Sequence, residues 1–228
     1  MIKKKSFMAY IATVFILIVS MLIAACGGPS ETKKDAAQNG KPIEITDVTG
    51  RTVTLKKNAE RVVLQWSGSG GPFFTISALM GKDTPKVIAG MDTSLQQYRA
   101  DMWKHFTTEM PELAKIPEVG TVGDKNFNVE QVVALHPDVI FIPVDLKNQY
   151  ESDAKQKLDE AGVQTIYIDY HAENLEKHQK SIEAIGKALG KEERAAEISK
   201  FYTNHVTKVL DRVKTINKPK PTVYLEVG

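Results

Sequence analysis

The residues of this chain best suited to binding chemistry lie in a glycine-rich turn between Gln65 and Phe73. A short apolar run over residues 61–65 predicts a buried strand, and the apolar pattern from Phe73 predicts a helix. Pro72 suits the first helical position, where no amide donor is needed. A turn of this kind exposes backbone amides at a helix N-terminus, where an anion can bind. The candidate ligand contacts here are Trp66, Ser67, Gly68, Ser69, Gly70 and Gly71.

This turn is not a known nucleotide-binding loop. No Gly-Lys-Ser/Thr follows it, and it lacks the G-x-G-x-x-G spacing. Two interpretations remain open: the glycines contact a ligand, or they only permit a tight turn. The indole and hydroxyl groups of Trp66, Ser67 and Ser69 at the same rim favour ligand contact.

Further candidates occupy loops that follow predicted strands or precede a predicted helix. Trp66 and Tyr98 suit flat or aromatic parts of a ligand, while Arg99 and Lys125 suit negative charge. The planar fork of an arginine clamps carboxylates and oxyanions, but a solvated charge at a helix end is an equally open interpretation of Arg99. The remaining candidates are Asn126, Asp145, Tyr170 and His171.

The histidines indicate neither a metal centre nor an active site. The five lie at positions 105, 136, 171, 178 and 205, and none belongs to H-E-x-x-H or another metal-binding spacing. A G-x-S-x-G nucleophile elbow is also absent. We interpret His136 as a helix-end contact and expect His178 and His205 on solvated helix faces, whereas ligand contact and a structural role both remain open for His171. We therefore expect a protein that is not an enzyme, with no cofactor and no direct metal site.

Residues 1–25 have the features of an export signal. Three lysines at positions 3–5 precede an apolar run from Met8 to Ala25, as in a secretory signal peptide. A membrane-spanning helix has a similar length, but the run ends in Leu-Ile-Ala-Ala before Cys26, which resembles the lipobox of bacterial lipoproteins. That resemblance implies that Cys26 carries the lipid, with acyl chains such as palmitate. It also implies a location on the extracytoplasmic face of the cell membrane.

Residues 26–41 are small and polar, which is typical of a flexible tether. Cys26 is the only cysteine, so a disulfide framework is excluded. The first 25 residues hold three lysines and no acidic residue, which leaves 27 basic and 28 acidic residues in the remainder. This balance gives no basic footprint for nucleic acid.

The elements that must position the candidates alternate between strands and helices. Alternating apolar and polar residues around Thr49-Gly50 predict a hairpin, and Asn128 is a candidate N-cap for a helix that Pro137 ends. The alternation from residue 61 to 171 predicts an α/β fold with a mostly parallel sheet, whose ligands bind beyond the carboxyl ends of the strands. The predicted strands cover 61–65, 87–90, 139–142 and 163–168, and the other predicted helices cover 100–110 and 150–161.

Two long helices are predicted next, over residues 172–189 and 192–216. At about 1.5 Å per residue, the second spans roughly 37 Å. Lys218-Pro219-Lys220-Pro221 ends it, and residues 222–227 have the pattern of a new strand.

Several segments of the chain resemble the substrate-binding lipoproteins of ABC importers, in the iron-siderophore, haem and vitamin B12 group. The segments are DVTGRTV at 47–53 with RVV at 61–63, VG at 119–120 continuing through NVE to LHPDVI at 135–140, LDEAGV at 158–163, and IGKALGKE at 185–192. The resemblance implies two α/β lobes joined by one long backbone helix, with ligand held between them. It therefore implies a class III periplasmic-binding-protein-like fold with a three-layer first lobe.

On this basis residues 42–171 form the N-terminal lobe, residues 172–218 form a helical segment with the interlobe helix, and residues 219–228 begin the C-terminal lobe. Almost all of a second lobe is missing, so we expect either a fragment of a longer protein or a truncated gene product.

The resulting hypothesis is a lipid-anchored, monomeric binding protein that captures an iron complex, such as a ferric siderophore, for a membrane permease. Alternatives in the same class are receptors for molybdate, tungstate or another small anion, and receptors for haem or cobalamin. A sensor or adhesin module and an exported enzyme are less favoured.

Overall fold

The computed structural model describes residues 41–66, 71–172, 174–217, 219 and 221–226. The expected signal peptide, Cys26 and nearly all of the tether lie outside the described residues. So do four candidate contacts of the glycine-rich turn, namely Ser67, Gly68, Ser69 and Gly70.

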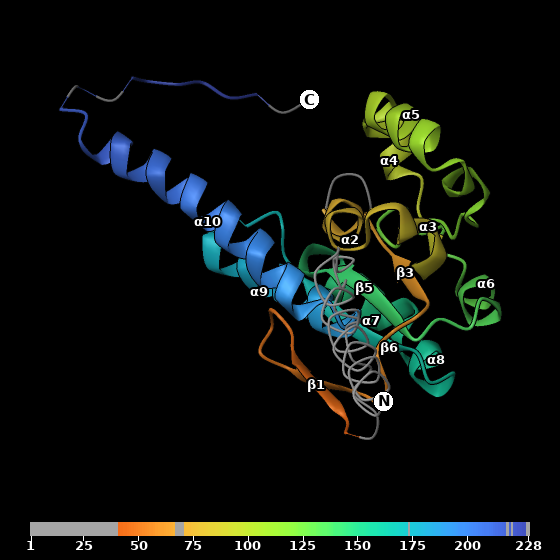
Figure 1. Ribbon diagram of the computed structural model, residues 1–228. Helices are drawn as coiled ribbons and strands as arrows, with labels where there is room; N and C mark the ends of the chain where they lie inside the picture. The colour runs from red at the N-terminus through yellow and green to blue at the C-terminus, as the bar shows by residue number, and fades with distance from the viewer. Residues whose placement is uncertain (1–40, 67–70, 173, 218, 220, 227–228) are drawn as a thin grey trace, which may run out of the picture. The chain divides into compact units, whose positions relative to one another are not determined.

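A four-stranded parallel sheet lies at the centre of the described chain (Figure 1). Its spatial order is β4-β3-β5-β6, and each neighbouring pair is parallel. The strands are β3 (Val62–Leu64), β4 (Ile88–Met91), β5 (Val139–Pro143) and β6 (Gln164–Ile168). The predicted α/β fold with a parallel sheet is therefore confirmed. Because β4 and β5 flank β3 on opposite sides, the strand order reverses between β3 and β5, which is where ligands of such sheets bind.

Helices cover both faces of this sheet. Val62 and Leu64 belong to one buried cluster, which includes residues of α2 and α9. Val63 and its register partner Ile140 belong to a second cluster on the opposite face, with residues of α6, α7 and α8. The bounds are α2 (Pro72–Met80), α6 (Val129–Ala134), α7 (Lys147–Asp153), α8 (Lys155–Glu160) and α9 (Leu175–Ala188). The predicted three-layer arrangement is confirmed.

Short elements complete the connections. Pro72 begins α2, as expected. Helix α4, before α5, was not expected from the sequence, and the helix predicted over 150–161 is wrong as a single element, because Ala154 departs from helical geometry (φ −134°) between α7 and α8. No proline or glycine explains that break. The remaining elements are the 3-10 helices η1 (Gly81–Asp83), η2 (Pro111–Lys115) and η3 (Val144–Leu146), with the α-helices α3 (Thr84–Val87), α4 (Ser94–Tyr98) and α5 (Ala100–Glu109).

The predicted hairpin is confirmed as β1 (Ile43–Thr46) and β2 (Thr52–Leu55). Asp47 is buried in its turn, and its carboxylate accepts hydrogen bonds from the Thr49 and Arg51 amides at 2.9 and 3.2 Å. The Arg51 guanidinium in turn donates to the Thr165 carbonyl of β6. This turn therefore joins the hairpin to the sheet.

The predicted N-cap of α6 is also confirmed, since the Asn128 side chain accepts a hydrogen bond from the Gln131 amide at 3.0 Å. The helix ends at Ala134, three residues before Pro137. The exposed His136 has a left-handed backbone (φ 48°) at that end, and its amide donates to the Val133 carbonyl.

Helix α10 (Glu192–Lys214) packs against α9 near its start, where Ala195 and Ser199 are buried (Figure 1). Its later apolar side chains, including Val209 and Val213, are exposed. The strand predicted over 222–227 is wrong for the residues that the structure describes, because the stretch 221–226 is exposed and pairs with no other strand. In the described part of the chain, no helix has both the length and the apolar character that crossing a bilayer requires.

Candidate ligand-binding site

Three predicted contacts meet where the strand order reverses, at the carboxyl edge of the sheet. Trp66 follows β3, Asp145 follows β5 and His171 follows β6. The rings of Trp66 and His171 lie 5.0 Å apart between centroids, and His171 Nδ1 hydrogen-bonds to Asp145 Oδ2. The His171 ring, which Asp145 on the neighbouring strand exit binds, therefore packs against the indole.

A hollow of about 350 Å³ opens beside Trp66. It lies within the range typical of small-molecule sites, roughly 300–1,000 Å³. Tyr98 is 70% exposed there, so its ring is available to a ligand. The described lining residues are Trp66, Ser94, Gln97, Tyr98, Thr121 and Asp124.

The loop that carries Thr121 and Asp124 reaches this edge because the segment before it extends the sheet. The Met91 amide donates to the Pro117 carbonyl, and the Val119 amide donates to the Met91 carbonyl, both at 3.1 Å. This bridge between Met91 and Glu118 is parallel, so the segment leaves at the carboxyl edge like the strands. The loop that follows this segment therefore reaches the carboxyl edge of the sheet.

The Gln65 side chain hydrogen-bonds to the backbone of this loop. Gln65 was not among the candidate residues predicted from the sequence. Its fully buried side-chain amide donates to the Gly120 carbonyl at 2.9 Å and accepts from the Val122 amide at 2.8 Å. It thus replaces the backbone partners that a neighbouring strand would supply. The available signal was a polar residue at the end of an otherwise apolar buried strand.

Asn126, a predicted ligand contact, has a structural role in the same loop. Its side-chain oxygen accepts a hydrogen bond from the Thr121 amide at 2.6 Å. Gly120 has a φ of 70°, and a Cβ there would lie 2.2 Å from the Asn126 carbonyl oxygen. The loop therefore closes tightly on itself and presents Thr121 in one position.

The backbone of Trp66 is strained, with a φ of 50°. Such left-handed conformations are uncommon for large side chains and concentrate at functional sites. Across the glycine-rich turn, Gly71 (φ 81°) leaves no room for a Cβ, which would lie 2.8 Å from Tyr170 Cγ. This contact gives Gly71 a packing role.

Tyr170 supports the turn from within. Its hydroxyl hydrogen-bonds to Thr75 Oγ1 at 2.7 Å. Burial raises the pKa of the Tyr170 phenol above its ordinary value, against the opposing effect of the Thr75 bond. The Tyr170 hydroxyl thus already hydrogen-bonds to a residue of α2. Tyr170 is not part of the hollow's described lining.

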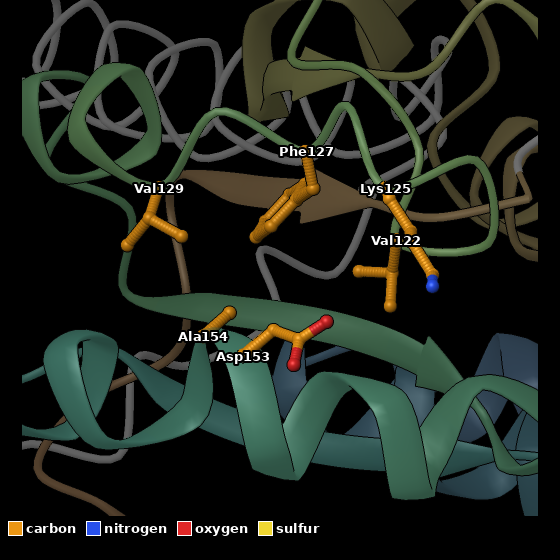
Figure 2. Close-up of a pocket in the computed structure, with 6 residues that line it drawn as sticks. All are labelled: Val122, Lys125, Phe127, Val129, Asp153 and Ala154. Atoms are coloured by element: carbon orange, nitrogen blue, oxygen red, sulfur yellow. The ribbon is translucent and has the colours of Figure 1, made fainter.

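Lys125 lines a second hollow (Figure 2), whose described lining does not include Trp66. This second hollow of about 80 Å³ is lined by Val122, Lys125, Phe127, Val129, Asp153 and Ala154. Arg99 is exposed at the junction of α4 and α5 and does not contribute to either described lining. The two cations expected to meet negative charge are therefore not gathered around Trp66.

Asp169 anchors the segment that presents His171. Its buried carboxylate accepts hydrogen bonds from the Ala172 amide at 2.9 Å and the Lys177 ammonium at 2.7 Å. Burial alone would raise the pKa of Asp169, but these two donors bring it below its ordinary value. The exit of β6 is thus fixed by a charged hydrogen-bond network.

The expectation for His178 was wrong. Its ring is half-buried and stacks on Tyr202 of α10 at 5.5 Å, with Nδ1 bonded to the Tyr202 hydroxyl and Nε2 to the Ala172 carbonyl. The helical periodicity did not reveal that α10 would cover this face of α9. His205 is exposed, as expected. Among the residues that the structure describes, no group of three or more His, Cys, Asp or Glu could hold a metal ion.

Comparison with known proteins agrees with this architecture. The sequence profile of the family described as periplasmic binding protein matches residues 81–228. The uncharacterized ABC transporter substrate-binding lipoprotein YvrC of Bacillus subtilis strain 168 is 27% identical over 218 residues, which cover 93% of this chain and 62% of YvrC.

Two solved structures from Veillonella parvula are also similar. The TroA-like periplasmic binding protein FepB is 89% identical with a TM-score of 0.78, over 82% of this chain and 54% of FepB. A periplasmic solute binding protein from strain DSM 2008 is 27% identical with a TM-score of 0.57, over 74% of this chain and 47% of that protein.

This chain spans about half the length of those two solved relatives. The resemblance to ABC-importer binding proteins is confirmed, and such proteins bind substrates rather than transform them. This chain belongs to the periplasmic binding protein family.

Proposed function

We propose that this chain is the substrate-binding component of an ABC importer and that it captures an iron complex, such as a ferric siderophore. The observation that carries this proposal is the hollow beside Trp66 at the reversal point of the sheet. Its walls come from loops after different strands, which is the usual construction of a ligand site in this kind of sheet.

The size and chemistry of the hollow favour a chelate over a small oxyanion. Trp66 and Tyr98 offer aromatic faces, and Ser94, Gln97 and Thr121 add polar groups to the lining. A bare tetrahedral anion would use little of that aromatic surface. Haem and cobalamin also have flat faces, and they are included among the ligands tested below.

The proposal includes the anchoring and the division of the chain. Residues 1–25 act as the signal peptide, Cys26 receives the lipid and residues 26–41 tether the folded part to the extracytoplasmic face of the membrane. Residues 42–171 form the N-terminal lobe, residues 172–218 contain the interlobe helix α10, and residues 219–228 begin the C-terminal lobe. The lipobox-like sequence before Cys26 and the lipoprotein name of YvrC support the lipid anchor.

The proposed partners are the chelate, the membrane through the lipid, and a membrane permease that receives the chelate. The chain acts as a monomer, and no nucleic acid takes part.

Ligand binding is tested by titrating the purified chain with ferric siderophores, haemin, cyanocobalamin and molybdate, using calorimetry. We expect saturable binding of at least one ferric siderophore. Exclusive binding of molybdate would replace the iron complex by the small-anion alternative, and binding of none of these compounds would refute the proposal.

Lipid attachment is tested separately by expressing the chain in a bacterium and separating detergent and aqueous phases. The unchanged chain is expected in the detergent phase, and Cys26→Ala is expected to abolish acylation. Lipid attachment that survives this substitution would contradict the assignment of Cys26.

A further inference from the structure

The hollow beside Trp66 has an unexpected charge. Its described lining contains one ionised side chain, the carboxylate of Asp124, and no lysine or arginine. The sequence had suggested positive side chains for a negatively charged chelate, but Lys125 lines the second hollow and Arg99 lies outside both linings.

The neighbouring acidic groups at this edge have positive or donating partners. Asp145 hydrogen-bonds to His171, and Asp169 is bound by Lys177. Asp92 is buried and accepts the Ser94 amide at 2.7 Å. In the described part of the chain no ion pair involves Asp124, which is thus the side chain that sets the charge of the hollow.

We infer that this hollow selects a chelate whose metal complex is neutral or positively charged, with Asp124 as the specificity-determining residue. This inference rests on the proposed function and names the class of iron complex that the site accepts. A carboxylate beside a bound ligand attracts a cation and repels an anion, most strongly where water is displaced from between them. The faces of Trp66 and Tyr98 add to the preference, because aromatic faces attract cations.

The neutral side chains of the lining fit the same class of ligand. Gln97 and Thr121 bring an amide and a hydroxyl, groups that hydrogen-bond the amide and hydroxamate oxygens of an uncharged complex. A catecholate complex with several negative charges instead requires several cationic partners, which this lining does not supply.

The test compares three iron complexes of different charge: cationic ferrioxamine B, neutral ferrichrome and trianionic ferric enterobactin. Their affinities for the unchanged chain are measured by calorimetry at low and high salt. We expect the cationic and neutral complexes to bind more tightly than the trianionic one, and we expect salt to weaken the binding of the cationic complex, because salt screens attraction between exposed charges.

Asp124→Asn removes the charge and keeps the shape of the side chain. We expect it to weaken the cationic complex about tenfold and to leave the neutral complex within about twofold, as for the loss of one favourable charge contact. The matched control is Lys125→Gln, which removes a charge from the next residue but in the other hollow and is expected to change each affinity by less than about twofold. Circular dichroism confirms that both variants fold.

This inference would be overturned, and the proposed function left intact, if ferric enterobactin bound more tightly than the other two complexes and its affinity rose further in Asp124→Asn. So would an unchanged affinity for the cationic complex in Asp124→Asn. If the variant does not fold, the salt dependence of the unchanged chain's affinity for the cationic complex still tests the inference, because an affinity that does not fall with salt would contradict it. Failure of all three complexes to bind would instead count against the proposed function itself.

Discussion

Two hollows share one loop, residues 121–127, and they differ in size and in the side chains that line them. The first, beside Trp66, has two aromatic rings, polar groups and the Asp124 carboxylate. The second is smaller and has both a lysine (Lys125) and an aspartate (Asp153) in its lining, and Val122 in its wall belongs to the hydrophobic core. One short loop thus contributes to an open binding surface and to the packing beneath it.

Neighbouring residues of this loop are assigned to different hollows. Asp124 lines the first, and Lys125, which Figure 2 labels, lines the second. Lys125 has a left-handed backbone (φ 56°), which marks a sharp turn of the chain directly after Asp124. Charges adjacent in sequence therefore do not form a common electrostatic site unless the backbone directs them to one side.

The largest effect is expected from Gln65→Leu, which should disrupt the loop that lines both hollows. The substitution leaves the buried Gly120 carbonyl and Val122 amide without a partner, at a cost of about 3 kcal/mol in the free energy of unfolding. Urea denaturation measures the loss. Gln97→Ala, a change to an exposed glutamine, is the control, and a loss below about 0.5 kcal/mol for Gln65→Leu would contradict the role of Gln65.

Asp169→Asn should affect the first hollow indirectly, through the His171 ring that contacts Trp66, and not the second hollow. Loss of the charged bond to Lys177 is expected to lower the free energy of unfolding by about 2 kcal/mol at neutral pH.

The stability difference between Asp169→Asn and the unchanged chain should depend on pH. Because folding lowers the pKa of Asp169, its contribution is complete above the unfolded value of about 3.9 and disappears as the pH falls through the lower folded value. Below about pH 4 the unfolding curves of the variant and the unchanged chain should therefore converge. A difference that stays constant from pH 7 to pH 3 would show that the charge of Asp169 is not responsible.

Phe127→Ala should damage the second hollow alone. The ring is partly buried and packs against the core cluster on that face of the sheet, so its removal is expected to cost about 1.5 kcal/mol in stability, less than for a fully buried ring. Chelate affinity, measured where the variant is folded, should not change. A parallel loss of affinity would show that the two hollows are coupled.

Tyr98→Ala should give the opposite result at the first hollow. Its ring is 70% exposed, so stability should stay within about 0.5 kcal/mol, while affinity for a bound chelate falls about fivefold through loss of an aromatic contact. Calorimetry and thermal unfolding on the same sample separate the two quantities. An unchanged affinity would remove Tyr98 from the site.

Much of the scaffold could be predicted because its signals are local. Asn128 caps its helix, Pro72 begins α2 and the apolar runs form the parallel strands, each from a few consecutive residues. Trp66, Asp145 and His171 were placed correctly at one edge because parallel strands align their carboxyl ends.

The remaining features depend on contacts between distant segments. Gln65 acquires its role from a loop 55 residues away, and His178 from a helix 24 residues later. The division of Asp124 and Lys125 between hollows depends on backbone dihedrals that residue type does not specify. These are interactions that a periodic pattern within one element cannot contain.

The two halves of α10 differ in packing, and this difference affects the helix–coil equilibrium of the second half. Its first turns are supported by α9, through Ala195, Ser199 and the Tyr202–His178 bond, whereas residues 207–214 are exposed on all sides in the described chain. Isolated helices shorter than about 12–15 residues are marginal in water, so this second half is helical as a continuation of the supported half. Amide hydrogen exchange should therefore accelerate in steps from Thr203 toward Lys214, and the gradient would report directly on any partner that comes to cover the exposed face.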